Sequence, residues 1–295
     1  MDDILIRKVY FFMEITEDLL KSLVDFEDSI YGERVVFYDV GMIDASFCAN
    51  RLVRNVTFRP FQLEKVVEIC YKFSSDALFR EKTINEAFLV CPVLVYRLFL
   101  MGVYTIKEIE SHLNRPHKFT TCYYFRNYIR DYERYLENTE LPDGFDSRDY
   151  IDFEKIDLMI QYGFVPSSIE FSMKYDDLQG LLGHFCGIHV DSKVCWSPFE
   201  WSREPKSFEY LSFCGLFGSL KCFKYLLMNG YSVNNDVLCS VVFGGSTDLL
   251  HLSMNESNMG ICFLAAAEYC RLSIMKFLLE QGVYIDEKDE YGLIF

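Results

Sequence analysis

The stretch Gly218-Ser-Leu-Lys-Cys-Phe-Lys-Tyr-Leu-Leu-Met-Asn-Gly230 decides the fold, because much of it returns at Cys270-Arg-Leu-Ser-Ile-Met-Lys-Phe-Leu-Leu-Glu-Gln-Gly282. Both copies place apolar residues on one face of a short helix, and both end in a glycine that suits a left-handed C-cap. A weaker copy begins at Gly245, so successive units start 27 and then 25 residues apart. Self-similarity at a nearly fixed period indicates a repeat architecture. The sequence therefore predicts a repeat protein.

The region before these copies divides at a turn-forming segment, Leu141-Pro-Asp-Gly-Phe-Asp146. After it, the pattern predicts a helix over Phe153–Gly163, a longer helix from Pro166 to about Phe185, and a loop over 191–207. Apolar residues recur at helical spacing throughout, so we expect an all-α chain. The predicted domains are an irregular helical region, 1–138, and a repeat region, 150–295.

The first region shows helical segments without a strict period. A proline in mid-pattern removes a hydrogen-bond donor, so Pro92 should start a new helix. The pattern Thr105-x-x-Glu108 is a capping box, which predicts a helix start at that point. The helices expected in this region are Ile15–Phe26, Phe61–Phe73, Thr83–Met101 in two parts, Thr105–Leu113 and Cys122–Leu136.

The second region resembles an ankyrin array. Leu211–Gly218 stands where the ankyrin pattern has its first helix, 221–230 matches the second helix, and 231–234 and 283–292 look like connecting fingers. Lys174-Tyr-Asp-Asp-Leu178 together with Phe217–Gly230 is similar to large ankyrin families of flagellate protists, which carry a helical region of unknown function before the repeats. The resemblance implies a degenerate ankyrin-like α-solenoid. The Thr-Pro-Leu-His entry of the ankyrin pattern is absent, and Cys270 replaces a turn glycine.

The end of the chain departs from the array pattern. It stops at Gly292-Leu-Ile-Phe295, where a further first helix is expected. A solenoid needs a polar unit to cover its last apolar face. We therefore expect a truncated last unit.

Composition limits the partners. The chain has 29 basic and 44 acidic residues, a net charge of −15, which disfavours nucleic acid and anionic membrane surfaces. No apolar run approaches the ~20 residues of a membrane span, and the N-terminus lacks the order of a secretory signal. Eleven scattered cysteines fit buried free thiols in a reducing cytoplasm better than a disulfide framework.

The sequence gives little support to a catalytic site or a metal site. His184, Cys186 and His189, with Cys195 nearby, supply four zinc-type ligands, but no paired Cys-x-x-Cys accompanies them, and buried cysteine with surface histidine is the favoured interpretation. Cys222 and His251 fall in neighbouring units, where we expect a packing thiol and an exposed histidine. The adjacent pair Asp176-Asp177 is expected to be solvated. We expect no enzyme, no cofactor and no small-molecule substrate.

What a repeat array offers is surface. On the resemblance to ankyrin arrays, the partner-binding positions are those of the fingers, and exposed Tyr and Asn are typical of contact surfaces. An equally weighted alternative is that the fingers only bond to their neighbours. These positions are Tyr231, Asn234, Asn235, Asp236, Tyr284, Asp286, Glu287, Asp289 and Tyr291.

The expected function is non-catalytic protein–protein recognition or scaffolding with a protein partner that the sequence does not identify. One alternative is an adaptor in which residues 1–138 dock a larger complex while the repeats select its client. A second is a zinc-dependent module around His184, Cys186 and His189. A third is a remnant chain without present function.

Overall fold

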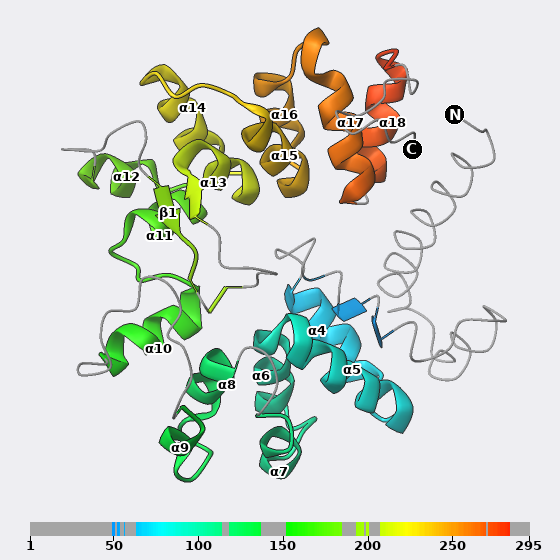
Figure 1. The fold of residues 1–295 in the computed structure, drawn as a ribbon, viewed down its shortest axis with the longest axis vertical. Helices are drawn as coiled ribbons and strands as arrows, with labels where there is room; N and C mark the ends of the chain where they lie inside the picture. The colour runs from blue at the N-terminus through cyan, green and yellow to red at the C-terminus, as the bar shows by residue number, and fades with distance from the viewer. Residues whose placement is uncertain are drawn as a thin grey trace, which may run out of the picture. The chain divides into compact units, whose positions relative to one another are not determined.

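The computed structural model describes residues 49–50, 52–53, 56, 63–113, 118–136, 152–184, 193–197, 199–200, 207–269 and 271–283. These residues are mostly helical, with one small sheet, so the expected all-α class is confirmed (Figure 1). The predicted helix Ile15–Phe26 and the predicted boundary over 141–146 lie outside the described residues. The described residues form two compact units, described in turn below.

The N-terminal unit contains the described residues up to Val165, together with 195–197 and 199–200. The helix over Phe153–Tyr162 follows the predicted boundary over 141–146 in the sequence, yet it belongs to this unit. Its helices are α4 (Leu63–Lys72), α5 (Ala77–Val90), α6 (Pro92–Leu100), α7 (Ile106–Glu110), α8 (Lys118–Phe125), α9 (Tyr132–Leu136) and α10 (Phe153–Tyr162).

Capping residues set two of these helix starts. The Asp76 side chain accepts a hydrogen bond from the backbone N–H of Phe79 at 2.7 Å, which satisfies a free donor in the first turn of α5. Pro92 occupies the first turn of α6, where its missing N–H costs no helical hydrogen bond. The predicted division at Pro92 is confirmed.

The predicted continuous helix Cys122–Leu136 is wrong. Helix α8 ends at Phe125 and α9 begins only at Tyr132. Between them Asp131 has φ +56°, a left-handed conformation that cannot continue a right-handed helix.

Aromatic side chains form much of the core of the N-terminal unit. Phe79, Phe88 and Phe125 are fully buried. The segment at 199–200 packs on α8, since the buried Tyr124 hydroxyl donates to the carbonyl oxygen of Phe199 at 3.0 Å. This bond supplies the partner that a buried hydroxyl needs.

The C-terminal unit contains described residues from Pro166 onward, except those of the 195–200 segment. Short strands β1 (Lys193–Cys195) and β2 (Ser207–Glu209) pair with each other. The helices are α11 (Ile169–Lys174), α12 (Leu178–His184), α13 (Tyr210–Phe217), α14 (Leu220–Met228), α15 (Asn235–Gly244), α16 (Thr247–Ser253), the 3-10 turn η3 (Glu256–Asn258), α17 (Met259–Glu268) and α18 (Leu272–Glu280).

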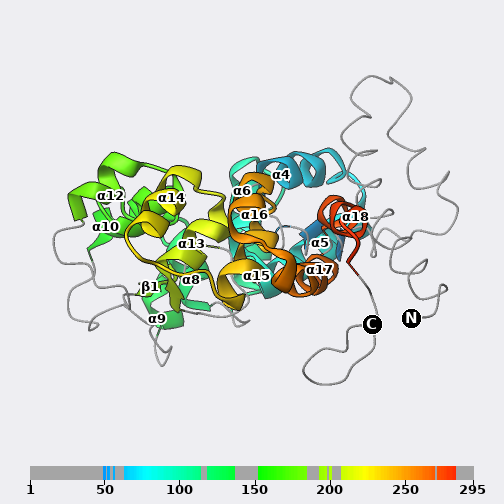
Figure 2. The ribbon, with the colours of Figure 1, turned by 90° about the horizontal axis from the view of Figure 1, so that it is seen from above.

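These helices pack as four successive pairs, α11/α12, α13/α14, α15/α16 and α17/α18. The first helices contact one another in chain order, α11 with α13, α13 with α15, and α15 with α17. The second helices do the same from α12 through α14 to α16. Figure 2 shows the later pairs as two rows, with α14, α16 and α18 in one and α13, α15 and α17 in the other.

The first-helix row forms the centre of this unit. All eight residues of α13 are buried, as expected for a helix that is apolar around its circumference. Helices α13 and α15 approach closely, because a Cβ added to Gly244 would lie 2.3 Å from the carbonyl oxygen of Gly215. Only glycine at position 244 permits this backbone contact.

The predicted glycine ends of the repeated helices are confirmed. Gly230 follows α14 with φ +92°, and Gly282 follows α18 with φ +85°. The predicted single helix from Pro166 to Phe185, in contrast, is wrong. The chain leaves α11 after Lys174 and starts α12 at Leu178, with Asp176 at φ +54° between them.

Two polar side chains tie successive pairs together. The Ser219 hydroxyl, just before α14, donates to the carbonyl oxygen of Met173 in α11. The Arg271 guanidinium, just before α18, donates to the carbonyl oxygen of Phe243 in α15. Both acceptors are carbonyls in the last turn of the preceding pair's first helix, where the regular i+4 helical donors end.

Candidate functional site

The four predicted finger residues that the structure describes lie in the connection between α14 and α15 and in the first turn of α15. The Tyr231 side chain is buried and stacks on Tyr210, with ring centroids 6.3 Å apart and planes at 18°. Its backbone N–H donates to the carbonyl oxygen of Leu226 at 3.2 Å. Tyr231 therefore anchors the finger to the start of α13.

Asn234 is the N-cap of α15. Its side-chain oxygen accepts from the backbone N–H of Val237 at 2.9 Å, and its amide donates to Glu209 Oε2 at 3.1 Å. Both ends of the side-chain amide are therefore hydrogen-bonded. The oxygen fixes the start of α15, and the nitrogen links it to β2. Truncating Asn234 would therefore change the fold of the finger as well as its surface.

Asn235 and Asp236 are exposed in the first turn of α15. A carboxylate at this position is favoured by the positive end of the helix dipole. Burial raises the pKa of the neighbouring Cys239 thiol, and the carboxylates of Asp236 and Glu268 raise it further. Asp236 on α15 and Glu268 on α17 therefore both lie near Cys239, and both are exposed. We call this pair of carboxylates the acidic edge.

The equivalent connection between α16 and α17 is closed by its own side chains. Asn255 Oδ1 accepts from the backbone N–H of Ser257 at 3.0 Å, and Asn258 Oδ1 accepts from the N–H of Asn255 at 2.8 Å. Glu256 is exposed between them. The remaining predicted finger residues, Tyr284, Asp286, Glu287, Asp289 and Tyr291, lie outside the described residues.

The Asp176-Asp177 pair forms two helix caps. Asp176 Oδ1 accepts from the backbone N–H groups of Lys221 at 2.8 Å and Cys222 at 2.9 Å, so it caps α14 from the preceding helix pair. Asp177 Oδ1 accepts from the N–H of Gly180 at 3.1 Å in α12. The sequence did not predict the Asp176 cap, because the N–H groups that it caps lie 45 and 46 residues further along the chain.

Cys222 and His251 occupy the environments expected of them. Cys222 is buried, its Sγ lies 3.8 Å from the Ser172 carbonyl oxygen, and burial together with Asp176 raises the pKa of its thiol to about 12. His251 is exposed and lies edge-on to the Phe277 ring, with centroids 5.2 Å apart. A thiol with so high a pKa holds almost no nucleophilic thiolate at neutral pH.

Of the proposed zinc ligands, the structure describes the side chain of His184 alone, and that residue is exposed at the end of α12. Cys186, His189 and the side chain of Cys195 lie outside the described residues. Elsewhere in the described part of the chain, no group of three His, Cys, Asp or Glu residues is arranged to hold a metal ion.

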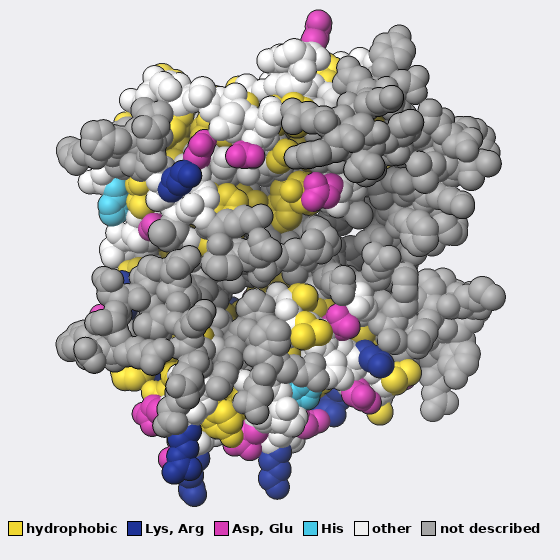
Figure 3. Space-filling model, in the orientation of Figure 1, with side chains coloured by type: hydrophobic (Ala, Val, Ile, Leu, Met, Phe, Trp, Pro, Cys, Tyr) yellow, Lys and Arg dark blue, Asp and Glu magenta, His cyan; other side chains and the backbone are white. Residues whose placement is uncertain are grey.

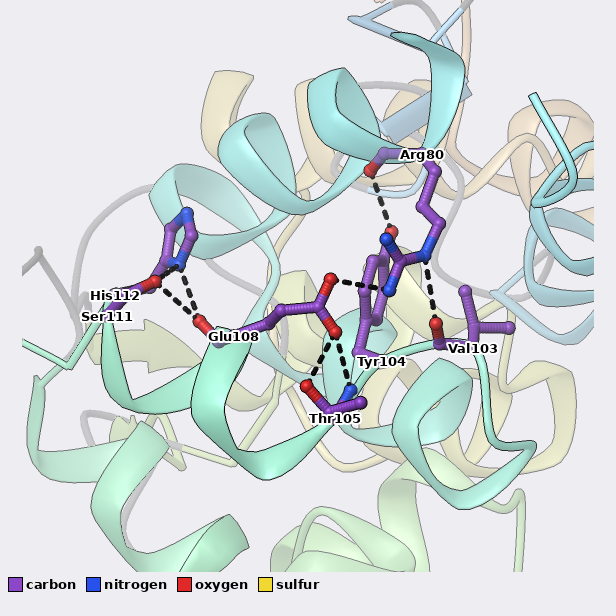
Figure 4. Close-up of polar contacts among 7 residues, drawn as sticks. All are labelled: Arg80, Val103, Tyr104, Thr105, Glu108, Ser111 and His112. Carbon is purple, nitrogen blue, oxygen red and sulfur yellow. Dashed lines mark hydrogen bonds and ion pairs between the residues drawn. The ribbon is translucent and has the colours of Figure 1, made fainter. Parts of the chain in front are cut away.

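A polar network in the N-terminal unit joins α5 to α7 (Figure 4). The Arg80 guanidinium donates to the Val103 carbonyl oxygen at 2.9 Å and to Glu108 Oε1 at 2.5 Å. Glu108 Oε2 accepts from the backbone N–H and the hydroxyl of Thr105, both at 2.8 Å, so the predicted capping box is present. The Tyr104 hydroxyl donates to the Arg80 carbonyl oxygen at 3.0 Å.

The electrostatics of this network favour the ionised carboxylate. Burial alone would raise the pKa of Glu108, but hydrogen bonds from Thr105 and Arg80 outweigh it, so the pKa is lowered. Nearby, His112 Nδ1 lies 2.8 Å from the Glu108 carbonyl oxygen, and the His112 ring stacks on Phe88 at 5.0 Å. The network therefore holds α5 and α7 together, and its polar groups already have hydrogen-bond partners.

No helix among the described residues is long and apolar enough to cross a membrane. No protein-family model matches this chain, and no curated protein or solved structure matches it.

Proposed function

We propose that this chain is a non-catalytic protein-recognition module built on a degenerate ankyrin-like solenoid. The observation that carries the proposal is the chain-order contact of first helices with first helices and second helices with second helices. Stacked helix pairs of this kind bury a continuous core and leave an extended surface for a partner.

The partner surface in this proposal is the acidic edge formed by Asp236 and Glu268, with Asn235 beside it. All three residues are exposed. In this proposal, Tyr231 and Asn234 hold the finger in place through their contacts with Tyr210 and Glu209. The edge is negative, as is the chain as a whole, so electrostatic attraction favours a basic segment of the partner protein.

The proposed setting is the cytoplasm. All seven cysteines with described side chains are free thiols, and six of them are buried. Free buried thiols are typical of proteins from reducing compartments.

The test is quantitative affinity capture from a lysate of the source cells with the full chain as bait. The edge variant carries Asp236→Lys and Glu268→Lys. The control variant carries Asp248→Lys and Glu280→Lys, which make the same charge change at exposed acidic residues of second helices. Asp248 is also a first-turn residue of its helix, as Asp236 is.

We expect at least one protein that wild type and the control variant retain and that the edge variant loses by about tenfold or more. Equal capture by all three baits would remove the acidic edge from the proposal. Matched far-UV spectra establish that both variants are folded.

A further inference from the structure

The N-terminal unit exposes a group of large aromatic and apolar side chains on α6, on the turn after α8, and at the start of α10. Leu100, Tyr128 and Phe153 are 50%, 48% and 46% exposed. Tyr96, Phe99 and Leu100 share one face of α6, because their spacing is i, i+3 and i+4. We call the group the Tyr128 patch: Tyr96, Phe99, Leu100, Tyr128 and Phe153.

The Tyr128 patch rests on buried rings that fix its shape. Phe99 lies edge-on to Tyr128 and to the fully buried Phe125, with centroids 4.8 Å and 5.2 Å away. Tyr96 stacks on the buried Tyr124 at 5.0 Å. Rings held in this way lose little conformational freedom when a partner binds, which favours binding.

One arginine, Arg126, contacts the Tyr128 patch, and two more follow Tyr128 in the sequence. The Arg126 guanidinium lies 5.8 Å from the centroid of the Phe153 ring, donates to the Tyr123 carbonyl oxygen at 3.0 Å and pairs with Asp157. Arg130 and Arg134 follow Tyr128 closely in sequence and are exposed, and among the described residues neither forms an ion pair. Figure 3 shows Lys and Arg side chains projecting beside α9.

The charge of this region is opposite to that of the whole chain. Residues 118–136 contain four basic residues and two acidic ones, a net charge of +2, whereas the whole chain has a net charge of −15. Exposed Tyr and Arg beside a rigid apolar base is the composition of interface hot spots. The local positive charge selects for a negative partner.

We propose that the Tyr128 patch binds an acidic peptide segment of a partner protein. A large apolar or aromatic side chain of that segment packs on Tyr96, Phe99 and Tyr128, while its carboxylates pair with Arg130 and Arg134. This site is independent of the acidic edge in the C-terminal unit, and the two surfaces differ in the charge of the partner that they attract.

The test is a selection of random peptides displayed on phage against the full-length protein. The patch variant carries Tyr128→Ser and Arg130→Ser. The control variant carries Tyr71→Ser and Lys65→Ser on α4, where Tyr71 is 47% exposed against 48% for Tyr128 and Lys65 is exposed like Arg130. A third variant, Arg130→Glu with Arg134→Glu, leaves every ring contact in place, so it keeps the test valid if the patch variant fails to fold.

We expect enriched peptides that are rich in Asp and Glu around a Phe, Tyr or Leu. The strongest of them, synthesised with a fluorescent label, should bind the patch variant about tenfold or more weakly and the control variant with wild-type affinity. Its affinity should fall between about 50 mM and about 500 mM salt, because added salt screens exposed charges.

The proposal is overturned if no peptide prefers wild type to the patch variant, or if the preferred peptides carry no excess of acidic residues. Sedimentation at several protein concentrations tests whether a second copy of this chain, and not an acidic peptide, occupies the Tyr128 patch. Self-association that the patch variant loses, without any preference for acidic peptides, would assign the surface to a second copy of this chain.

Discussion

Gly244 stands where α15 passes the backbone of α13. A Cβ at this position would lie 2.3 Å from the carbonyl oxygen of Gly215 and 2.9 Å from that of Leu216, and neither backbone atom can move aside as a flexible side chain would. Gly244→Ala should therefore lower the free energy of unfolding by about 1–3 kcal/mol. Urea denaturation followed by far-UV circular dichroism measures this loss.

Gly183 provides the control, because it lies in α12 and a Cβ there meets no atom within 4 Å. Gly183→Ala should leave stability unchanged or raise it by about 0.5–1 kcal/mol, since alanine is the better helix former. Equal effects of the two substitutions would contradict the close approach of α13 and α15.

Asp176 combines a left-handed backbone with a cap on another helix. Asp176→Ala removes the acceptor for the N–H groups of Lys221 and Cys222 and leaves a Cβ residue at φ +54°. We expect a loss of about 1–2 kcal/mol in the free energy of unfolding. Asp176→Asn should lose less than half of that, because asparagine caps helices and tolerates the left-handed conformation. Denaturation curves in which asparagine performs no better than alanine would refute the capping role.

Single residues show where sequence reasoning reached its limit. Glycine at 230 and 282 could be placed in a left-handed C-cap, because the pattern that requires it is local. Tyr231 in a turn gave no sign of burial, since the ring that covers it, Tyr210, comes from another helix. The capping partner of Asp176 was hidden for the same reason.

At the scale of elements, the short helix α7 depends on its link to α5. The lowered pKa of Glu108 means that its charged form stabilises the fold. This contribution is present above the ordinary pKa of glutamate, about 4.3, and is lost as the pH falls through the lower folded-state value. The Glu108 side chain is 35% exposed, so solvent screening limits its effect to about 0.5 kcal/mol.

Glu108→Gln should therefore be less stable than wild type at neutral pH, and the difference should shrink as the pH falls below about 4. Thermal melts from acid to neutral pH measure it. Glu110→Gln is the control, since Glu110 is exposed on the same helix. A constant difference between wild type and Glu108→Gln across this range would disprove the charge-dependent contribution.

The elements that sequence reasoning found are those with a chemical signal at their ends. Pro92 and the Thr105–Glu108 capping box both mark helix starts in the structure. The breaks after Phe125 and Lys174 were missed, because apolar residues continue at helical spacing across both of them. Each break contains an aspartate with positive φ, Asp131 or Asp176, and aspartate alone is too common in helices to predict a break.

At the scale of the whole molecule, buried thiols report on the opening of each compact unit. Burial raises the pKa of Cys70 and Cys91 in the N-terminal unit to about 12. It likewise raises the pKa of Cys222 to about 12 and that of Cys262 to about 11 in the C-terminal unit. At about pH 8 these four thiols should be alkylated only when their unit opens, and Cys239, which is partly exposed, should react first in the C-terminal unit.

Gly244→Ala turns this reactivity into a test of the two-unit architecture. It should speed alkylation of Cys214, Cys222 and Cys262 and leave the rates at Cys70, Cys91 and Cys122 unchanged, because a chain of several compact units need not unfold in one step. Mass spectrometry after timed alkylation gives the rate at each site. Faster labelling of both sets would mean that the chain opens as one cooperative body.

In four polar bonds between helix pairs of the described residues, the donor belongs to the later pair and the acceptor to the earlier one. Lys221 and Cys222 at the start of α14 donate to Asp176, Ser219 donates to Met173, and Arg271 donates to Phe243. A ribosome releases the chain from its N-terminus, at roughly 5–20 residues per second. Each emerging helix pair therefore finds its acceptors on a pair that has already left the exit tunnel, so the direction of synthesis is also a direction in which these repeats can be added one at a time.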